Sequence, residues 1–387
     1  MEPAVFMAAT AAMKTAGSTL VIVAVVLAHT AVPYMHEPPK WWYVADRNVS
    51  GTILHSIFIT IIDAVLMPIL FFLAGFFTLP SLKRRGIATF CWGKLRHLGL
   101  VWLLGITLIS PLCVHIWTYT HGEPISFIRM IFHDFWIDRF DQSAFWFLPI
   151  LLAMQLLAAT FYRVILLKKE YPEKYRQKNT GAILLGMNII LIVFFVIIAL
   201  LSPELFGLTV AQAPDQHVVF LGFFVVQAPR LPLYIAFFLL GIYAWRANWL
   251  RPDGYLPNQW HWCVMNICAM VLYLGIRARL FDGDEISHTI ALAISFTFLC
   301  TTALMSSLAT FSRKLNLATP FWQSLTRNSY GIYFLHLAFV LPLALLLADI
   351  ALNVWLKTFF VFSVSLGCSW LLSALVLTRA PLLRRIF

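Results

Sequence analysis

The sequence predicts an all-α integral membrane protein, with about ten transmembrane helices in one bundle and both termini in the cytoplasm. Three observations carry this prediction: the composition, the number and length of the apolar segments, and the distribution of the basic residues. Of the 387 residues, 61% are hydrophobic and 12% are charged, whereas a soluble domain has roughly 45–50% apolar and about 25% charged residues. A water-soluble core cannot bury that much apolar surface.

The apolar segments are long and numerous enough for a multi-pass protein. A helix that crosses the hydrocarbon core needs about 20 mostly apolar residues. A further apolar run, 218–226, has only about half that length, so we expect an interfacial or re-entrant segment there and no eleventh span. The ten candidate spans are 18–34, 57–79, 98–116, 145–167, 183–201, 231–249, 261–276, 289–311, 329–347 and 355–376.

The basic residues are distributed unevenly between the two sides of this arrangement. When alternate loops are placed on alternate sides, 20 of the 28 Lys and Arg residues fall on one side. Cytoplasmic loops carry such an excess, so we expect an even number of spans with cytoplasmic termini. The net charge of +11 does not indicate nucleic-acid binding, because the basic residues form short clusters and no single stripe. No repeat or linker divides the chain, so residues 1–387 are expected to form one domain.

Ionisable residues inside the predicted spans are few, and the membrane makes them expensive unless they pair or line a cavity. His29 lies near the outer end of the first span, and its imidazole can accept a proton at ambient pH; it is either a general base or a structural histidine. Asp63, in the second span, either orients His29 or forms an ion pair that fixes helix packing. His336, in the ninth span, is expected chiefly as a structural residue satisfied by its hydroxyl-rich helix.

Two other patterns have simpler explanations than chemistry. His133 and Asp138 match the spacing of a histidine and carboxylate in soluble glycerolipid acyltransferases, but two fixed positions in an outer loop arise easily by chance. The six cysteines lie in or beside apolar runs without the spacing of a zinc site or a disulfide framework, so no metal is predicted. The cluster around Lys94, Arg96 and His97 is first a signal of cytoplasmic location, although such side chains also suit phosphate groups.

Five short motifs follow one another along the chain. They are Val-Leu-Ala-His-Thr at 26–30, Phe-Phe-Leu-Ala-Gly-Phe-Phe at 71–77, Lys-Leu-Arg-His-Leu-Gly at 94–99, Ser-Ala-Phe-Trp-Phe-Leu at 143–148 and Asn-Ser-Tyr-Gly-Ile-Tyr-Phe-Leu-His at 328–336. In this order they resemble the acyltransferase 3 family of bacterial membrane O-acyltransferases, nearest to the branch that succinylates periplasmic glucans. The resemblance covers nearly the whole chain.

The resemblance implies a multi-pass protein of the bacterial inner membrane, surrounded by membrane lipid. It would move an acyl group from cytoplasmic acyl-CoA, either acetyl-CoA or succinyl-CoA, to a hydroxyl of an extracytoplasmic glycan. His29 maps to the family's essential base, and we expect Asp63 to orient it. Lys14, Lys94, Arg96 and His97 are the candidate residues for binding the donor, whereas Ser143, Trp146 and His336 are the candidates for the acceptor. Few small-residue packing motifs occur, so we expect a monomer or a weak dimer.

Two positions depart from the family pattern. Ser18 stands where the family carries an arginine eleven residues before the histidine, and Ala74 stands where a serine usually precedes the glycine of the second motif. Lys14, one turn before Ser18, is a possible substitute for the arginine. Two alternatives to the enzyme therefore stay open: a transporter or flippase of envelope saccharides, and a family member without catalytic activity that acts as an assembly partner.

Overall fold

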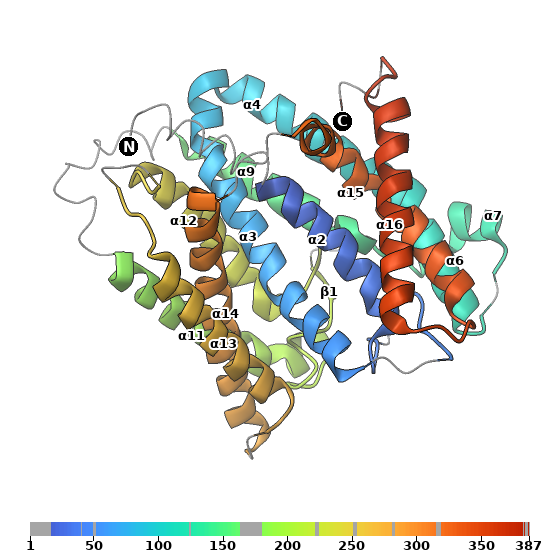
Figure 1. Cartoon of the computed structure of the whole chain (residues 1–387), viewed down its shortest axis with the longest axis horizontal. Coiled ribbons are helices and arrows are strands. Elements are labelled where there is room, and N and C mark those ends of the chain that lie inside the picture. The colour runs from blue at the N-terminus through green and yellow to red at the C-terminus, as the bar shows by residue number, and fades with distance from the viewer. Residues whose placement is uncertain are drawn as a thin grey trace. The chain divides into compact units, whose positions relative to one another are not determined.

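The computed structural model describes residues 17–39, 41–48, 52–123, 125–162, 180–220, 224–250, 254–280, 283–314, 319–381, 383 and 386. Within these ranges, nine helices are long and apolar enough to cross a membrane, and the apolar helix Thr19–Tyr34 is shorter. These helices coincide with the ten predicted segments, so the prediction of an all-α integral membrane protein is confirmed (Figure 1). The nine candidate spans are Ile53–Arg85, Ile87–Thr120, Ser143–Thr160, Thr180–Phe206, Ala228–Arg246, Gln259–Arg277, Glu285–Phe311, Pro320–Leu347 and Val354–Leu377.

The short apolar run at 218–226 contains two strands. Strand β1 (Val218–Phe220) pairs antiparallel with β2 (Phe224–Val226), with Val218 opposite Val226. Branched and aromatic residues favour this extended pairing over a helix. The prediction that this run is no eleventh span is confirmed, and its form is a strand pair.

The described helices group into two compact units, each assembled from separate stretches of the chain. The first unit includes 64–92 and 153–314, and the second includes 18–63, 93–152 and 319–386. Helices α3 (Ile53–Arg85), α4 (Ile87–Lys94) and α9 (Phe147–Thr160) each begin in one unit and end in the other. The remaining elements of the first unit are α11 (Thr180–Phe206), the strand pair, η8 (Ala228–Arg230), α12 (Leu231–Arg246), α13 (Gln259–Arg277) and α14 (Glu285–Lys314).

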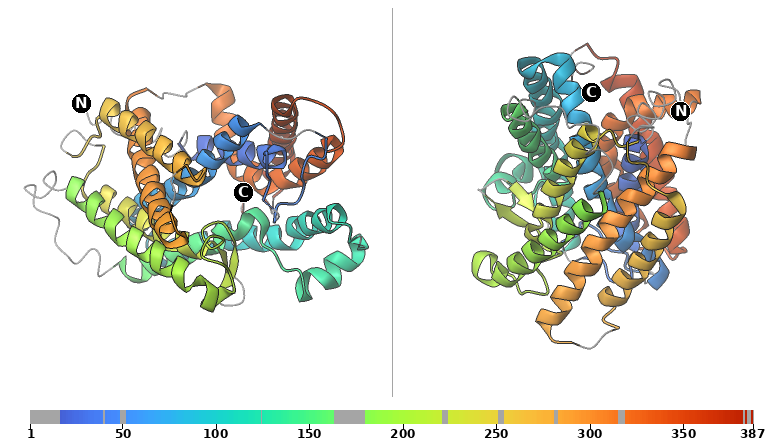
Figure 2. Two further views of the ribbon diagram at one scale, coloured as in Figure 1. Left: turned by 90° about the horizontal axis from the view of Figure 1, so that it is seen from below. Right: turned by 90° about the vertical axis from the view of Figure 1, so that its left-hand side faces the viewer.

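In the first unit, two glycines let α3 and α12 approach closely. A Cβ added to Gly75 would lie 2.0 Å from the carbonyl oxygen of Phe238, and one added to Gly241 would lie 2.2 Å from that of Phe72. Small residues permit such backbone contact between membrane helices. The glycine of the second motif is therefore explained by helix packing. In the same unit, α13 and α14 pack side by side (Figures 1 and 2).

The second unit contains the first predicted span and the last two. Helix α2 (Ser18–Ala31), continued by η2 (Val32–Tyr34), packs against α15 (Pro320–Leu347) and α16 (Val354–Leu372). A core of Val26, Leu325 and Ile332 lies between α2 and α15. The other elements of this unit are η3 (Leu95–Gly99), α5 (Leu100–Leu104), η4 (Gly105–Ile109), α6 (Ser110–Thr120), α7 (Phe127–Arg129), η5 (Met130–Asp134), α8 (Phe135–Ile137), η6 (Ser143–Trp146) and η9 (Ser373–Leu377).

Helices α2 and α15 run parallel and in register. The hydroxyl of Thr19 donates to that of Thr326 at 3.0 Å, and ten residues further along each helix His29 meets His336. Both pairs are separated by 307 residues in sequence, so the two helices rise together over about 15 Å. A shared direction for the first and ninth spans agrees with the predicted order of spans.

Candidate active site

The centre of the candidate site is a pair of histidines in the second unit. His29, which is half-buried, lies with Nδ1 2.8 Å from Nε2 of His336, which is fully buried. The ring planes differ by only 7°. The ring centroids lie 5.0 Å apart, much further than the 2.8 Å between the two nitrogens, so the rings approach through these nitrogens and not face to face. The contact is therefore a hydrogen bond between two nearly parallel rings.

A backbone carbonyl sets the direction of this hydrogen bond. Nδ1 of His336 lies 2.5 Å from the carbonyl oxygen of Tyr333. Because a carbonyl only accepts, Nδ1 of His336 carries a proton, and in the neutral ring its Nε2 is then the acceptor. Nδ1–H of His29 must therefore donate to His336, which leaves the lone pair of His29 on Nε2. The chain of contacts selects the tautomer that a general base needs.

An aromatic residue from the segment after η2 covers His29. The ring of Trp42, which is 6% exposed, stacks on the imidazole with 5.4 Å between centroids and 29° between planes. The adjacent Tyr43 donates its phenol proton to Asp141 at 2.5 Å. Ser143 Oγ lies 2.9 Å from the same phenol oxygen; since that phenol has one proton and gives it to the carboxylate, the serine hydroxyl is the donor here.

The environment of Tyr43 keeps its phenol protonated. Burial raises the pKa of Tyr43 well above its ordinary value, and the carboxylate of Asp141 raises it further. Thr120 also donates its hydroxyl to the Tyr43 carbonyl at 2.8 Å. We call Tyr43, Asp141 and Ser143 the tyrosine latch, because they hold the segment that carries Trp42.

A buried ion pair holds the far end of the same segment. Nζ of Lys357 lies 2.5 Å from the carboxylate of Asp46, and the two side chains are 0% and 2% exposed. The backbone N–H of Asp46 donates to Pro33 at 2.9 Å, and that of Arg47 to Ala348 at 3.0 Å. Removing one partner from such a pair leaves a buried charge unpaired, so the ion pair ties the segment firmly to α16, and the hydrogen bond of Arg47 ties it to the end of α15.

The two predicted acceptor residues of the fourth motif lie on η6. Ser143 has φ +47°, in the left-handed region that costs a residue with a side chain free energy. The next carbonyl, that of Ala144, accepts a hydrogen bond from the hydroxyl of Tyr333. Tyr333 thus joins η6 to the histidine pair, because its own carbonyl accepts from His336. Trp146, at the end of η6, is half-buried.

The contacts in the structure differ from two expectations, one about the partner of His29 and one about the partners of His336. Asp63 is an exposed residue of α3, and Nδ1–H of His29 donates its hydrogen bond to His336. The expected orienting carboxylate is therefore replaced by a second imidazole. His336 is likewise not satisfied by hydroxyls of its helix, since its two nitrogens meet a backbone carbonyl and His29. A neutral partner avoids the free-energy cost of placing a charged carboxylate inside the membrane.

The residues predicted to bind a donor lie around η3, apart from Lys14, which is outside the described residues. Lys94 ends α4, and Arg96 and His97 lie in the π-helical turn that follows, a feature often found at functional sites. The His97 ring donates from Nδ1 to the carbonyl of Ile386 at 2.7 Å. The carbonyl of His97 accepts from the hydroxyl of Tyr330. Lys94 and Arg96 are half-buried, and His97 is exposed.

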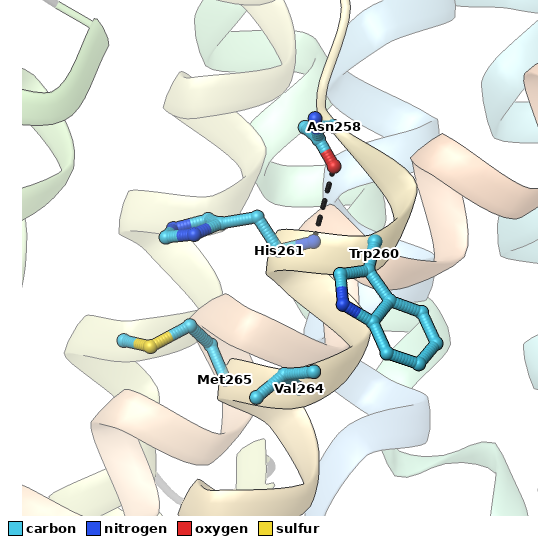
Figure 3. Close-up of a pocket in the computed structure, with 5 residues that line it drawn as sticks. All are labelled: Asn258, Trp260, His261, Val264 and Met265. Atoms are coloured by element: carbon cyan, nitrogen blue, oxygen red, sulfur yellow. Dashed lines mark hydrogen bonds between the residues drawn. The ribbon is translucent and has the colours of Figure 1, made fainter.

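Two further features do not form part of the histidine site. The ring of His133 hydrogen-bonds its neighbour Asp134 at 2.8 Å, so the carboxylate partner of His133 is Asp134 and not Asp138. In the first unit, a pocket of about 330 Å³ is lined by Asn258, Trp260, His261, Val264 and Met265 at the start of α13 (Figure 3). Asn258 caps this helix by accepting from the backbone N–H of His261 at 3.1 Å. The pocket lies at the start of a helix, and the residues that line it do not form a cluster of catalytic groups.

Sequence reasoning missed Trp42, Tyr43 and Asp141 as site residues; it named Ser143, but as a candidate for the acceptor and not as a partner of Tyr43. These residues lie outside the apolar segments, where polar and aromatic side chains are common and carry no cost that would single them out. The one available signal was the aromatic run 41–43 directly after the helix that carries His29.

The comparisons with known proteins identify the family of the chain. A model of the acyltransferase 3 family, described as an acyltransferase domain, matches residues 19–374. Because this match covers nearly the whole chain, the protein belongs to that family and is a multi-pass membrane acyltransferase. Neither a curated protein nor a solved structure matches the chain.

Proposed function

We propose that the protein is an O-acyltransferase that moves an acetyl or succinyl group from acyl-CoA to a hydroxyl of an extracytoplasmic glycan. The observation that carries the proposal is the tautomer of the histidine pair, which leaves Nε2 of His29 as a proton acceptor. Acyl transfer to a hydroxyl needs such a base, because an alcohol is a weak nucleophile until its proton is removed. Membership of the acyltransferase 3 family supports the reaction class.

In this mechanism, His29 takes the proton of the acceptor hydroxyl as its oxygen attacks the carbonyl carbon of the thioester. The new C–O bond forms a tetrahedral intermediate, and the C–S bond then breaks. The leaving thiolate of coenzyme A takes the proton from His29, so the base is restored and no charge accumulates. While His29 carries the extra proton, its Nδ1–H still donates to neutral His336, which holds the ring in place.

The donor and acceptor would reach His29 from opposite sides of the bacterial inner membrane. We place the phosphates of coenzyme A at Lys94, Arg96 and His97, with Lys14 as a further candidate, because guanidinium and ammonium groups bind phosphate well. Ser143 and Trp146 belong to the acceptor side in this proposal, with both termini cytoplasmic. The departure at Ala74 lies in the first unit, next to the close contact of α3 and α12, and leaves the histidine pair intact.

Binding of the donor tests the proposal directly. Coenzyme A, acetyl-CoA and succinyl-CoA are titrated into detergent-purified protein and followed by calorimetry and thermal shift. We expect saturable binding that Lys94→Ala/Arg96→Ala weakens by about tenfold or more, roughly 1.4 kcal/mol. Arg84→Ala/Arg85→Ala removes two exposed basic residues at the end of α3 and is the matched control. If folded protein binds none of the three compounds, the acyl-CoA donor is wrong, and the transporter becomes the better hypothesis.

A further inference from the structure

Trp42 carries a buried hydrogen-bond donor that nothing in the described part of the chain accepts. The side chain is 6% exposed, and its Nε1 is fully buried without a hydrogen-bond partner. A buried indole N–H normally finds a partner. Leaving one unpaired costs stability, so this donor needs an explanation.

Burial alone does not explain it, because the Nε1 atoms of Trp102, Trp249 and Trp322 are also buried without a partner. Trp42 differs from these three in its contact with the base, since its ring lies 5.4 Å from that of His29. It is therefore an unpaired donor beside the group that would start the reaction.

Trp42 is also held in position from both sides. Its backbone N–H donates to the carbonyl of Pro39 at 2.8 Å, and the next residue belongs to the tyrosine latch. Beyond that, the buried pair of Asp46 and Lys357 anchors the segment. A donor held by such contacts does not need to reorganise during a reaction, which is the property that makes electrostatic stabilisation in active sites effective.

Acyl transfer needs a donor of this kind. When the acceptor oxygen adds to the thioester carbonyl, that carbonyl oxygen becomes an oxyanion, and its charge must be stabilised in a site that excludes water. The two imidazoles cannot serve, because one takes the proton of the acceptor and the other accepts from its partner. Among the described residues whose rings stack on His29 or bond to it, the indole of Trp42 is the donor that remains.

We propose that Nε1–H of Trp42 donates a hydrogen bond to the carbonyl oxygen of the acyl group and to the oxyanion that forms from it. The indole keeps its proton throughout, while His29 moves the proton from the acceptor hydroxyl to the leaving thiolate. Trp42 is then a catalytic residue and more than a cover for His29. This inference rests on the proposed acyl transfer, and the experiment separates the two.

The first test is turnover. Purified protein in proteoliposomes receives acetyl-CoA or succinyl-CoA with soluble glucan oligosaccharides as acceptors, and the release of free coenzyme A is followed. Trp42→Phe keeps a stacking ring but lacks the N–H, and we expect kcat to fall by about 10²-fold with a smaller rise in KM, because the hydrogen bond to the bound thioester carbonyl is lost as well. Replacement of Trp42 by 3-benzothienylalanine, which has the shape of tryptophan without the N–H, gives the same loss if the Phe variant folds poorly.

A control on the same framework is available in Trp322→Phe. Trp322 lies fourteen residues before His336 on α15, about 21 Å away along the helix, and its Nε1 is unpaired as well. We expect this variant to keep the activity of the parent, because its indole does not contact the base.

A second test needs no acceptor. The parent should bind an acetyl-CoA analogue with CH2 in place of the sulfur, which keeps the carbonyl, more tightly than S-ethyl-CoA, which lacks it. Trp42→Phe should abolish that preference. If the preference survives in Trp42→Phe, or if the benzothienyl variant turns over like the parent, the inference is overturned while acyl transfer stands. If the parent releases coenzyme A no faster than His29→Ala, the proposed function fails, and this inference fails with it.

Discussion

Two polar clusters, one in each unit, differ in what they leave unpaired. In the first unit, the Asp215 carboxylate receives Arg230 at 3.0 Å and Arg277 at 2.6 Å, so its charge is fully met. In the second unit, the histidine pair is uncharged and commits three of its four ring nitrogens, leaving Nε2 of His29. A cluster whose carboxylate is fully paired stabilises the fold, whereas one that leaves a lone pair free can accept a proton.

The surroundings of the two clusters support this distinction. Arg230 is 5% exposed, and its guanidinium also lies 5.0 Å over the ring of Phe296. Asp215 precedes the strand pair, and Arg277 ends α13, so the cluster fastens a connecting segment to the helices. His29 instead stacks against the ring of Trp42, whose buried Nε1 has no hydrogen-bond partner among the described residues. Substitutions in the two clusters should therefore affect different measurements.

The largest effect is expected at His29. His29→Ala removes the base and should lower the rate of acyl transfer by about 10²–10⁴-fold, with donor binding retained. His36→Ala replaces an exposed histidine seven residues away and is the control. The rates are measured as release of coenzyme A in proteoliposomes at equal amounts of correctly inserted protein. Equal rates in the parent and in His29→Ala would show that His29 is not the base and that the histidine pair only contributes to packing.

The next effect concerns His336, which acts through His29. His336→Leu removes the acceptor for Nδ1–H and frees the other tautomer, so kcat should fall by up to about 10²-fold with KM nearly unchanged. His336→Gln keeps a side-chain oxygen that can accept from His29, and it should recover part of the rate. A purely structural role predicts the opposite: the two variants would lose activity in proportion to lost thermal stability, without rescue by Gln.

The tyrosine latch should show a moderate effect. Tyr43→Phe leaves Asp141 and Ser143 without the phenol and should cost about 1–2 kcal/mol of stability, with a several-fold lower rate because Trp42 is held less firmly. The raised pKa of Tyr43 also sets a pH window. The unfolded phenol ionises near pH ~10, while the folded one stays protonated. The contribution of Tyr43 to the free energy of unfolding is therefore complete below that pH and is lost as the pH rises above it.

Thermal unfolding of parent and Tyr43→Phe between pH 7 and pH 11 tests that window. The difference between them should shrink as the pH rises above about 10. A difference that stays constant across this range would show that Tyr43 contributes only packing.

The smallest effect on activity is expected at the cluster of Asp215 with its two arginines. Asp215→Asn leaves the buried Arg230 without its carboxylate and should lower stability by about 1–3 kcal/mol, but the rate of transfer per folded molecule should match the parent. Burial by itself would raise the pKa of Asp215, yet Arg277 and Arg230 reverse this and hold it below its ordinary value. The stabilisation is therefore present above pH ~4 and is lost as the pH falls further.

Unfolding of parent and Asp215→Asn at pH 7 and below pH 4 checks this sign. The two proteins should converge at the lower pH. If Asp215→Asn instead reduced turnover without reducing stability, the division between a structural and a reactive cluster would be wrong.

The fold was largely predictable because each membrane helix satisfies its own backbone hydrogen bonds. A segment such as Thr180–Phe206 can therefore be recognised as a span from its length and apolar composition alone. His29 could be singled out for a related reason, since an ionisable group inside a span is costly and rare. Asp63 drew attention by the same rule, but the rule identifies unusual residues without identifying their partners.

The sequence by itself determined the membrane class and the positions of the spans, and it singled out His29 as the candidate base, because these depend on local composition measured against the thickness of a bilayer. Only the tertiary structure decided that His336 is the partner of His29, that the ring of Trp42 stacks on His29, and that Tyr43 meets Asp141. The physical reason is distance along the chain. Residues 307 positions apart meet only when two helices pack in one register, and no local pattern records that register.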